Sequence, residues 1–122
     1  MSEQTVVVLG ASDKPARFSN MAIKKLISHG HKVIPVHPRL TIIDGVPVVS
    51  DMDNIEDAVD TLTLYVGPQR IHALIEKILA LRPKRVIFNP GTESAELERN
   101  LTEHNIPFVR ACTLVMLDAG EF

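Results

Sequence analysis

The stretch Thr5-Val6-Val7-Val8-Leu9-Gly10-Ala11-Ser12 decides the fold of this 122-residue chain. Its first five residues are β-branched or apolar, as required of a strand buried on both faces of a parallel sheet. Gly10 permits a tight turn after this strand, and residues 18–29 follow with apolar positions at helical spacing. The stretch therefore predicts the first strand, turn and helix of an α/β domain.

The alternation of strand and helix continues along the chain. Further strands are predicted at residues 32–36, 61–66, 85–88 and 106–109, and further helices at residues 54–59, 68–81 and 94–104. Residues 42–48 are expected to form a short excursion with a turn at Asp44-Gly45, and residues 113–117 an apolar tail. Ser19 or Asn20 is expected to cap the start of the first helix, and Gly30 its end. This order predicts a doubly wound, Rossmann-like parallel sheet of about five strands with helices on both faces.

The composition is that of a single globular domain spanning residues 1–122. Hydrophobic residues make up 45% and charged residues 23% of the chain, and the net charge is −2 with basic residues scattered along it. We therefore expect no nucleic-acid partner. The apolar runs fall short of the roughly 18–20 residues of a membrane span, and the start Met1-Ser2-Glu3-Gln4 lacks a signal pattern, so we expect no membrane partner and a cytoplasmic location. The single cysteine, Cys112, excludes an internal disulfide.

The loop after the first strand carries the strongest indication of a ligand. In an open parallel sheet, ligands bind at the carboxyl ends of the strands, where the strand order reverses. Gly10 lets a ligand approach the backbone, Ser12 adds a hydroxyl, and the helix that follows begins with free N–H groups that favour an anion. Lys14 and Arg17 add positive charge. We interpret the loop as a phosphate site; the alternative is a simple turn with two solvated cations.

The familiar nucleotide motifs are incomplete. Gly10-Ala11-Ser12-Asp13-Lys14-Pro15 keeps only the first glycine of the dinucleotide fingerprint, and the Walker pattern of ATPases is absent. NAD proteins place an acidic residue near the end of the second strand, where this chain has Val36-His37-Pro38-Arg39. A basic residue there suits a ribose with an additional phosphate, as in NADP or coenzyme A (CoA).

No catalytic group is predicted. The five histidines lie on different elements without metal-ligand spacing, so we expect no metal site, and only His37 lies on a binding loop. Glu93 could act as an acid or base, but it also fits the ordinary acidic start of a helix. No histidine stands beside Cys112 in the sequence to activate its thiol. The sequence therefore favours a protein without catalytic residues.

Several short motifs in a fixed order resemble one family. They are Gly10-Ala11-Ser12, Arg17-Phe18-Ser19, Val33-Ile34-Pro35-Val36-His37-Pro38, Gly45-Val46-Pro47-Val48, Tyr65-Val66-Gly67-Pro68 and Asn89-Pro90-Gly91. This set resembles the stand-alone CoA-binding domain proteins, which are similar to the N-terminal CoA-binding domain of the succinyl-CoA synthetase alpha subunit. The resemblance extends from Thr5 to the Cys112-Thr113-Leu114-Val115 segment.

The resemblance implies a set of contacts with CoA. It assigns Gly10, Ala11 and Ser12 to the pyrophosphate, with Lys14, Arg17 and Ser19 assisting at the start of the first helix. It puts Pro38 and Arg39 near the ribose and its phosphate, Val66 and Pro68 beside the adenine, and Asn89, Pro90, Gly91 and Glu93 near the pantetheine arm. His37 departs from the family pattern, which usually has Asn before this proline.

Two functional hypotheses remain. The synthetase subunit carries its phosphorylated histidine in a second domain that this sequence lacks, so the synthetase reaction is not implied. The first hypothesis is a non-catalytic module that binds CoA or a short acyl-CoA through its phosphates and adenosine, as a sensor, carrier or subunit of an unidentified protein partner. The alternative is a small NADP-dependent oxidoreductase or other nucleotide-using enzyme, for which the sequence offers no hydride-acceptor site.

Overall fold

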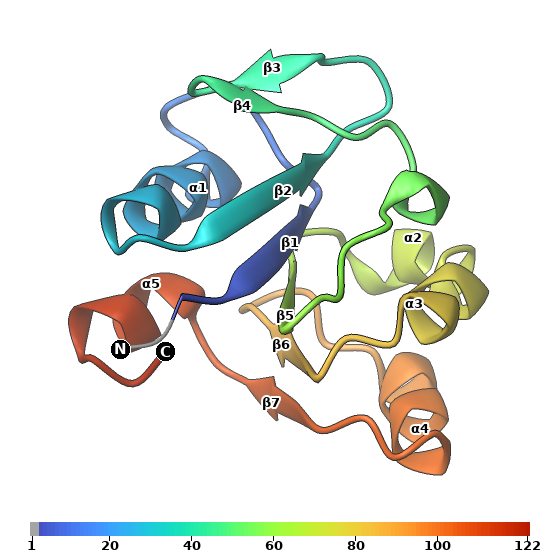
Figure 1. Ribbon diagram of the computed structural model, residues 1–122. Helices are drawn as coiled ribbons and strands as arrows, with labels where there is room; N and C mark the ends of the chain where they lie inside the picture. Colours follow the sequence, from blue (N-terminus) through green and yellow to red (C-terminus); the bar gives the residue numbers. More distant parts are fainter. Residues whose placement is uncertain (1–2) are drawn as a thin grey trace.

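β1 (Thr5–Leu9) is an interior strand of the sheet in a computed structural model that describes residues 3–122. Met1 and Ser2, which begin the segment without a signal pattern, lie outside the described residues. β1 pairs in parallel with β2 (Lys32–Val36) on one side and β5 (Thr61–Leu64) on the other. β6 (Arg85–Phe88) and β7 (Phe108–Arg110) complete a five-stranded sheet of order β2-β1-β5-β6-β7 (Figure 1). The predicted parallel sheet is confirmed.

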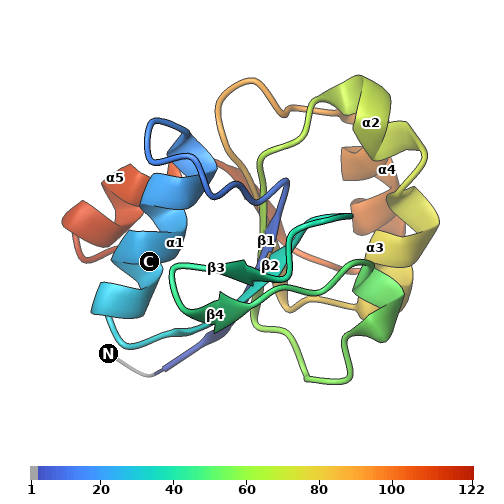
Figure 2. The same ribbon diagram turned by 90° about the horizontal axis from the view of Figure 1, so that it is seen from above.

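Helices cover both faces of this sheet (Figures 1 and 2). One face carries α1 (Phe18–Ser28) and α5 (Thr113–Asp118), and the other carries α2 (Pro68–His72), α3 (Ile75–Leu81) and α4 (Ala95–Glu103). Side chains alternate across β1, so Val6 and Val8 pack with Ile23 of α1, whereas Val7 and Leu9 pack on the α2–α4 side. Burial on both faces explains the continuous apolar sequence of β1, and the doubly wound, Rossmann-like architecture is confirmed.

The predicted excursion is a β-hairpin that lies beside the sheet. β3 (Ile42–Ile43) and β4 (Val46–Pro47) pair antiparallel, and the turn residues Asp44 and Gly45 have φ values of 49° and 80°. The chain then returns along β2: the Val49 N–H donates to the Pro35 carbonyl at 2.9 Å, and Val49 accepts from the His37 N–H at 3.1 Å. The hairpin and this segment therefore cover the β2 edge of the sheet.

The acidic helix predicted at residues 54–59 is wrong. A single 3₁₀ turn, η1 (Met52–Asn54), is present instead, and Asp51 caps it by accepting from the Asp53 N–H at 2.9 Å. The acidic residues that follow have separate partners, with Asp57 paired to Lys32 and Asp60 accepting from the Thr5 N–H. Asp57 and Asp60 therefore bind this segment to residues of β2 and β1 and are not part of a helix.

Other differences concern helix and strand ends. The helix predicted at residues 68–81 is interrupted between α2 and α3, where the Leu74 N–H donates to Ile71 three residues back, and the tail predicted at residues 113–117 is the helix α5. The strand predicted at residues 106–109 begins at Phe108, because the Ile106 N–H closes the end of α4 on the Leu101 carbonyl. Ser19 and Asn20 lie inside α1 and do not cap it.

Gly10 occupies the point where the chain leaves β1 and crosses the end of β5. Its φ is +89°, and a Cβ added there would lie 2.9 Å from both the Tyr65 carbonyl oxygen and Val66 Cγ1. Gly91 has a similar φ of +91° but no neighbouring atom within 4 Å of the same position. Gly10 is therefore required both by backbone conformation and by space.

We predict that Gly10→Ala lowers the free energy of unfolding by about 2–4 kcal/mol, through left-handed strain and the clash with β5. Gly91→Ala, which adds the strain alone, should cost about 1–2 kcal/mol. Urea denaturation of the two variants measures both values. Equal losses would contradict a close approach at Gly10.

Candidate functional site

A pocket of about 650 Å³ lies across the carboxyl ends of β2, β1 and β5. This is the switch point of the sheet, because the chain runs from β1 to β2 on one side and to β5 on the other. The volume suits a small molecule of nucleotide size. The lining residues come from several loops and helices: Leu9, Gly10, Ala11, Ser12, Asp13, Lys14, Arg17, Val36, His37, Pro38, Leu40, Ser50, Asp51, Met52, Tyr65, Val66, Arg70, Leu74 and Lys77.

One end of the pocket is formed by the loop of residues 10–17 and the start of α1. The Ser12 hydroxyl accepts from the Lys14 N–H at 3.1 Å, and the Arg17 N–H donates to the Lys14 carbonyl at 3.0 Å, so the loop is folded on itself. The residue that caps α1, Arg17, makes no side-chain bond to the amides of the first turn. Such amides attract anions. The start of α1 beside this loop therefore has no side-chain cap, and whether an anion binds there stays a prediction.

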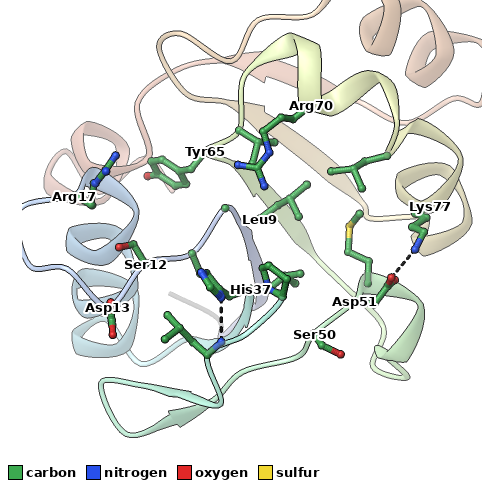
Figure 3. Close-up of a pocket in the computed structure, with 18 of the residues that line it drawn as sticks. Leu9, Ser12, Asp13, Arg17, His37, Ser50, Asp51, Tyr65, Arg70 and Lys77 are labelled. Carbon is green, nitrogen blue, oxygen red and sulfur yellow. Dashed lines mark hydrogen bonds and ion pairs between the residues drawn. The ribbon is translucent and has the colours of Figure 1, made fainter.

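Cations without carboxylate partners gather at this pocket. All 13 lysines and arginines lie in residues 3–122, and within that range six of them form ion pairs with Asp or Glu. Of the seven that do not, three line the pocket, namely Lys14, Arg17 and Arg70. Figure 3 shows Arg17 and Ser12 at one end and Arg70 reaching toward the middle. A cation with no internal partner is available to an anionic ligand.

The other end of the pocket is mainly apolar. Leu9, Val36, Met52 and Val66 are at most 7% exposed and form its floor, with Leu74 beside them. Asp51 and Lys77 form an ion pair at the far wall (Figure 3). The hydrogen bond from Lys77 lowers the pKa of Asp51, and the same bond raises the pKa of Lys77, so both groups stay charged near neutral pH. A flat, uncharged ring would fit this compartment better than a phosphate would.

His37 holds the turn after β2. Its Nδ1 accepts from the backbone N–H groups of Arg39 and Leu40, each at 3.0 Å, and Figure 3 draws one of these two bonds as a dashed line. An Asn side chain in the same place would accept from the N–H two residues on in the same way. His37 therefore supplies the kind of hydrogen bond that an Asn at this position would make.

Either Arg39 or Arg70 could contact the ribose phosphate that the family resemblance assigns to Arg39. The Arg39 side chain is exposed and is not among the residues that line the pocket, whereas Arg70 of α2 is. The sequence analysis missed Arg70, together with Asp51, Met52 and Lys77. Asp51 and Met52 lie at η1 and Lys77 lies in α3, and only the packing of η1 and α3 brings these three residues to the pocket, whereas Arg70 lies in α2. The sequence could have indicated Arg70, because it follows Gly67 by three residues and so lies in the first turn of α2.

The remaining predicted residues lie outside the pocket lining, namely Ser19, Pro68, Asn89, Pro90, Gly91 and Glu93. Ser19 is buried in α1, and Pro68 begins α2. Asn89 is engaged internally: its Nδ2 donates to Thr63 Oγ1 at 2.7 Å, and its Oδ1 accepts from the Thr113 N–H at 2.9 Å. Asn89 therefore ties β6 to β5 and to α5.

Within residues 3–122, no group of three or more His, Cys, Asp or Glu residues could hold a metal ion. The same range contains no helix that is long and apolar enough to cross a bilayer.

Tyr65 forms part of the pocket wall beneath the loop, and its hydroxyl is buried with no hydrogen-bond partner among the described residues. Burial raises the pKa of its phenol to about 12. The group is therefore neutral across the physiological range.

Comparison with known proteins identifies the family and the fold of this chain. A family model described as "CoA binding domain" matches residues 4–118. A crystal structure of an uncharacterized protein is 44% identical, with a TM-score of 0.93 and full coverage of both chains. The uncharacterized protein YneT of Bacillus subtilis (strain 168) is 30% identical over 74 residues, which are 61% of this chain and 55% of YneT.

A larger enzyme shares the fold. The dinucleotide-forming acetyl-coenzyme A synthetase 1 of Ca. Korarchaeum cryptofilum, solved with phosphate and ADP, matches 88% of this chain and 25% of its own, at 19% identity and a TM-score of 0.77. The fold is thus an α/β domain of the kind that this larger enzyme also contains. The chain belongs to the CoA-binding domain family, as its ordered motifs predict.

Tyr65 is the single tyrosine of the chain and there is no tryptophan, so its ionisation can be followed directly by ultraviolet absorbance. We predict a titration midpoint near 12, against about 10 for an unfolded tyrosine. Because the native pKa is raised, this group's contribution to stability is complete below pH 10 and is lost as the pH rises through 12. A midpoint near 10 in the folded protein would contradict the buried hydroxyl.

Proposed function

We propose that this protein binds CoA or a short acyl-CoA through its phosphates and adenosine, as a module without chemistry of its own. The observation that carries the proposal is the meeting of an uncapped α1 with the unpaired cations Lys14, Arg17 and Arg70 at one pocket. Membership of the CoA-binding domain family supports it. We also propose that residues 1–122 act as one binding unit.

The phosphates would occupy the loop end of the pocket. The backbone of Gly10, Ala11 and Ser12 would approach the pyrophosphate, and Lys14 and Arg17 would neutralise it. This assignment is supported by the exposed cations and by the electrostatic preference of a helix start for anions. The solved acetyl-CoA synthetase, whose fold is similar, holds phosphate and ADP.

The adenosine would occupy the apolar end. The adenine would lie on the floor that includes Val66, with Pro68 at its outer side and the His37-Pro38 turn beside the ribose. Removal of the ring from water supplies affinity, and the polar groups at the rim supply orientation. The pantetheine arm would leave toward Asn89, Pro90, Gly91 and Glu93, where the proposal rests on the family resemblance alone.

The proposed phosphate site can be tested with the double variant Ser12→Ala/Arg17→Ala. Loss of a hydroxyl and a charge-assisted hydrogen-bond donor should weaken CoA binding by about 100-fold in a calorimetric titration. The melting temperature should change little, since both side chains lie at the surface of the loop. Arg99→Ala, which removes an exposed arginine of α4, is the matched control. Unchanged binding by the double variant would show that the phosphates lie elsewhere.

Comparison of CoA with dephospho-CoA tests the contact with the ribose phosphate. Wild-type protein should bind dephospho-CoA about 10–100-fold more weakly, because a charge-assisted hydrogen bond is lost. Arg39→Ala should abolish this preference if Arg39 holds the phosphate. Loss of the preference in Arg70→Ala instead would assign the contact to Arg70, and equal affinities in the wild type would exclude both.

A further inference from the structure

Asn20 is a buried polar residue that no part of the proposed ligand contacts. It lies in the first turn of α1, is 1% exposed, and does not line the pocket. Its Nδ2 donates two hydrogen bonds, one to the Ser12 carbonyl at 2.9 Å and one to Asp44 Oδ2 at 2.9 Å. One amide group thus connects the phosphate loop, α1 and the β3–β4 hairpin, whose turn lies near the loop in Figure 1.

The orientation of this amide is fixed by its partners. Both protons of Nδ2 point at oxygen acceptors, while Oδ1 is buried and has no partner within residues 3–122. A flipped amide would place Oδ1 against two other oxygens, so the two acceptors determine the rotamer. A buried acceptor without a donor is unfavourable, and the two bonds from Nδ2 offset this cost.

Asp44 is held in position from its own side. It is the first residue of the hairpin turn, with φ of 49°, and the pairing of β3 with β4 fixes that turn. Lys24 lies 4.0 Å from the other carboxylate oxygen, Oδ1. The hairpin therefore presents an oriented carboxylate to Asn20.

We propose that Asn20 and Asp44 are positioning residues, which clamp the Ser12 carbonyl and so hold the loop of residues 10–17 in its anion-binding shape. The part of this inference that concerns affinity rests on the proposed function. The clamp also makes the hairpin a part of the site, although the hairpin turn itself does not line the pocket. Any partner that displaces the hairpin would thereby loosen the loop and weaken binding.

Asp44→Gly is the most selective test. Glycine adopts the positive φ without strain, so the change removes the carboxylate and leaves the turn intact. Amide hydrogen exchange in the ligand-free protein should quicken about tenfold at Ala11, Lys14 and Arg17, whose N–H groups are hydrogen-bonded in or beside the loop. CoA affinity should fall by about tenfold.

Two further variants separate the hydrogen bond from other effects. Asp44→Asn keeps an oxygen acceptor and tolerates the left-handed conformation, so it should restore slow exchange and binding. Lys24→Ala removes the ion pair without touching the amide bonds and should behave as wild type. The double variant Asn20→Ala/Asp44→Gly should show the same rise in amide exchange and the same fall in CoA affinity as Asn20→Ala alone. The reason is that the two residues act through one contact.

Exchange at wild-type rates in Asp44→Gly would overturn the clamp. Faster exchange with unchanged CoA affinity would overturn its role in binding. If the wild-type protein bound no CoA, the proposed function would fail, while faster exchange in the same ligand-free variant would still support the clamp.

Discussion

The backbone of Gly10 approaches the end of β5 so closely that no side chain fits between them. This contact lets the chain turn off β1 directly over the neighbouring strand, and the Tyr65 N–H completes it by donating to the Leu9 carbonyl at 2.9 Å. The loop is thereby held at the switch point of the sheet, with the start of α1 opening onto the same pocket. The position of the proposed phosphate site follows from this one crossing.

The pocket combines two environments because it extends across the carboxyl ends of the strands from one layer of helices to the other. At the α1 side, loop amides and unpaired cations favour an anion; at the η1 and α3 side, core side chains such as Met52 and Leu74 favour an uncharged ring. A nucleotide carries both an anionic phosphate and an uncharged base, joined through a ribose. The phenol of Tyr65, at the wall of this pocket, is neutral near pH 7.

The elements that could be predicted from sequence are those determined locally. The β1 stretch requires burial on both faces, and Asp44-Gly45 supports a two-residue hairpin turn, so both were found. The helix expected at residues 54–59 failed because its acidic residues form individual bonds with Lys32 and Thr5, which are distant in sequence. In the site, the loop after β1 was found from its glycine and hydroxyl. The Asp51–Lys77 pair was missed because only packing brings it to the pocket, and Arg70 was missed although it follows Gly67 by three residues.

The ligand itself is the central claim, and a calorimetric titration of ligand-free wild-type protein with CoA and with NADP tests it most directly. Both ligands carry a pyrophosphate and a phosphorylated adenosine, so the comparison holds the charge nearly constant and varies the remainder of the molecule. We predict saturable, one-to-one binding of CoA and weaker binding of NADP. Absence of CoA binding, or tighter binding of NADP, would contradict the assignment.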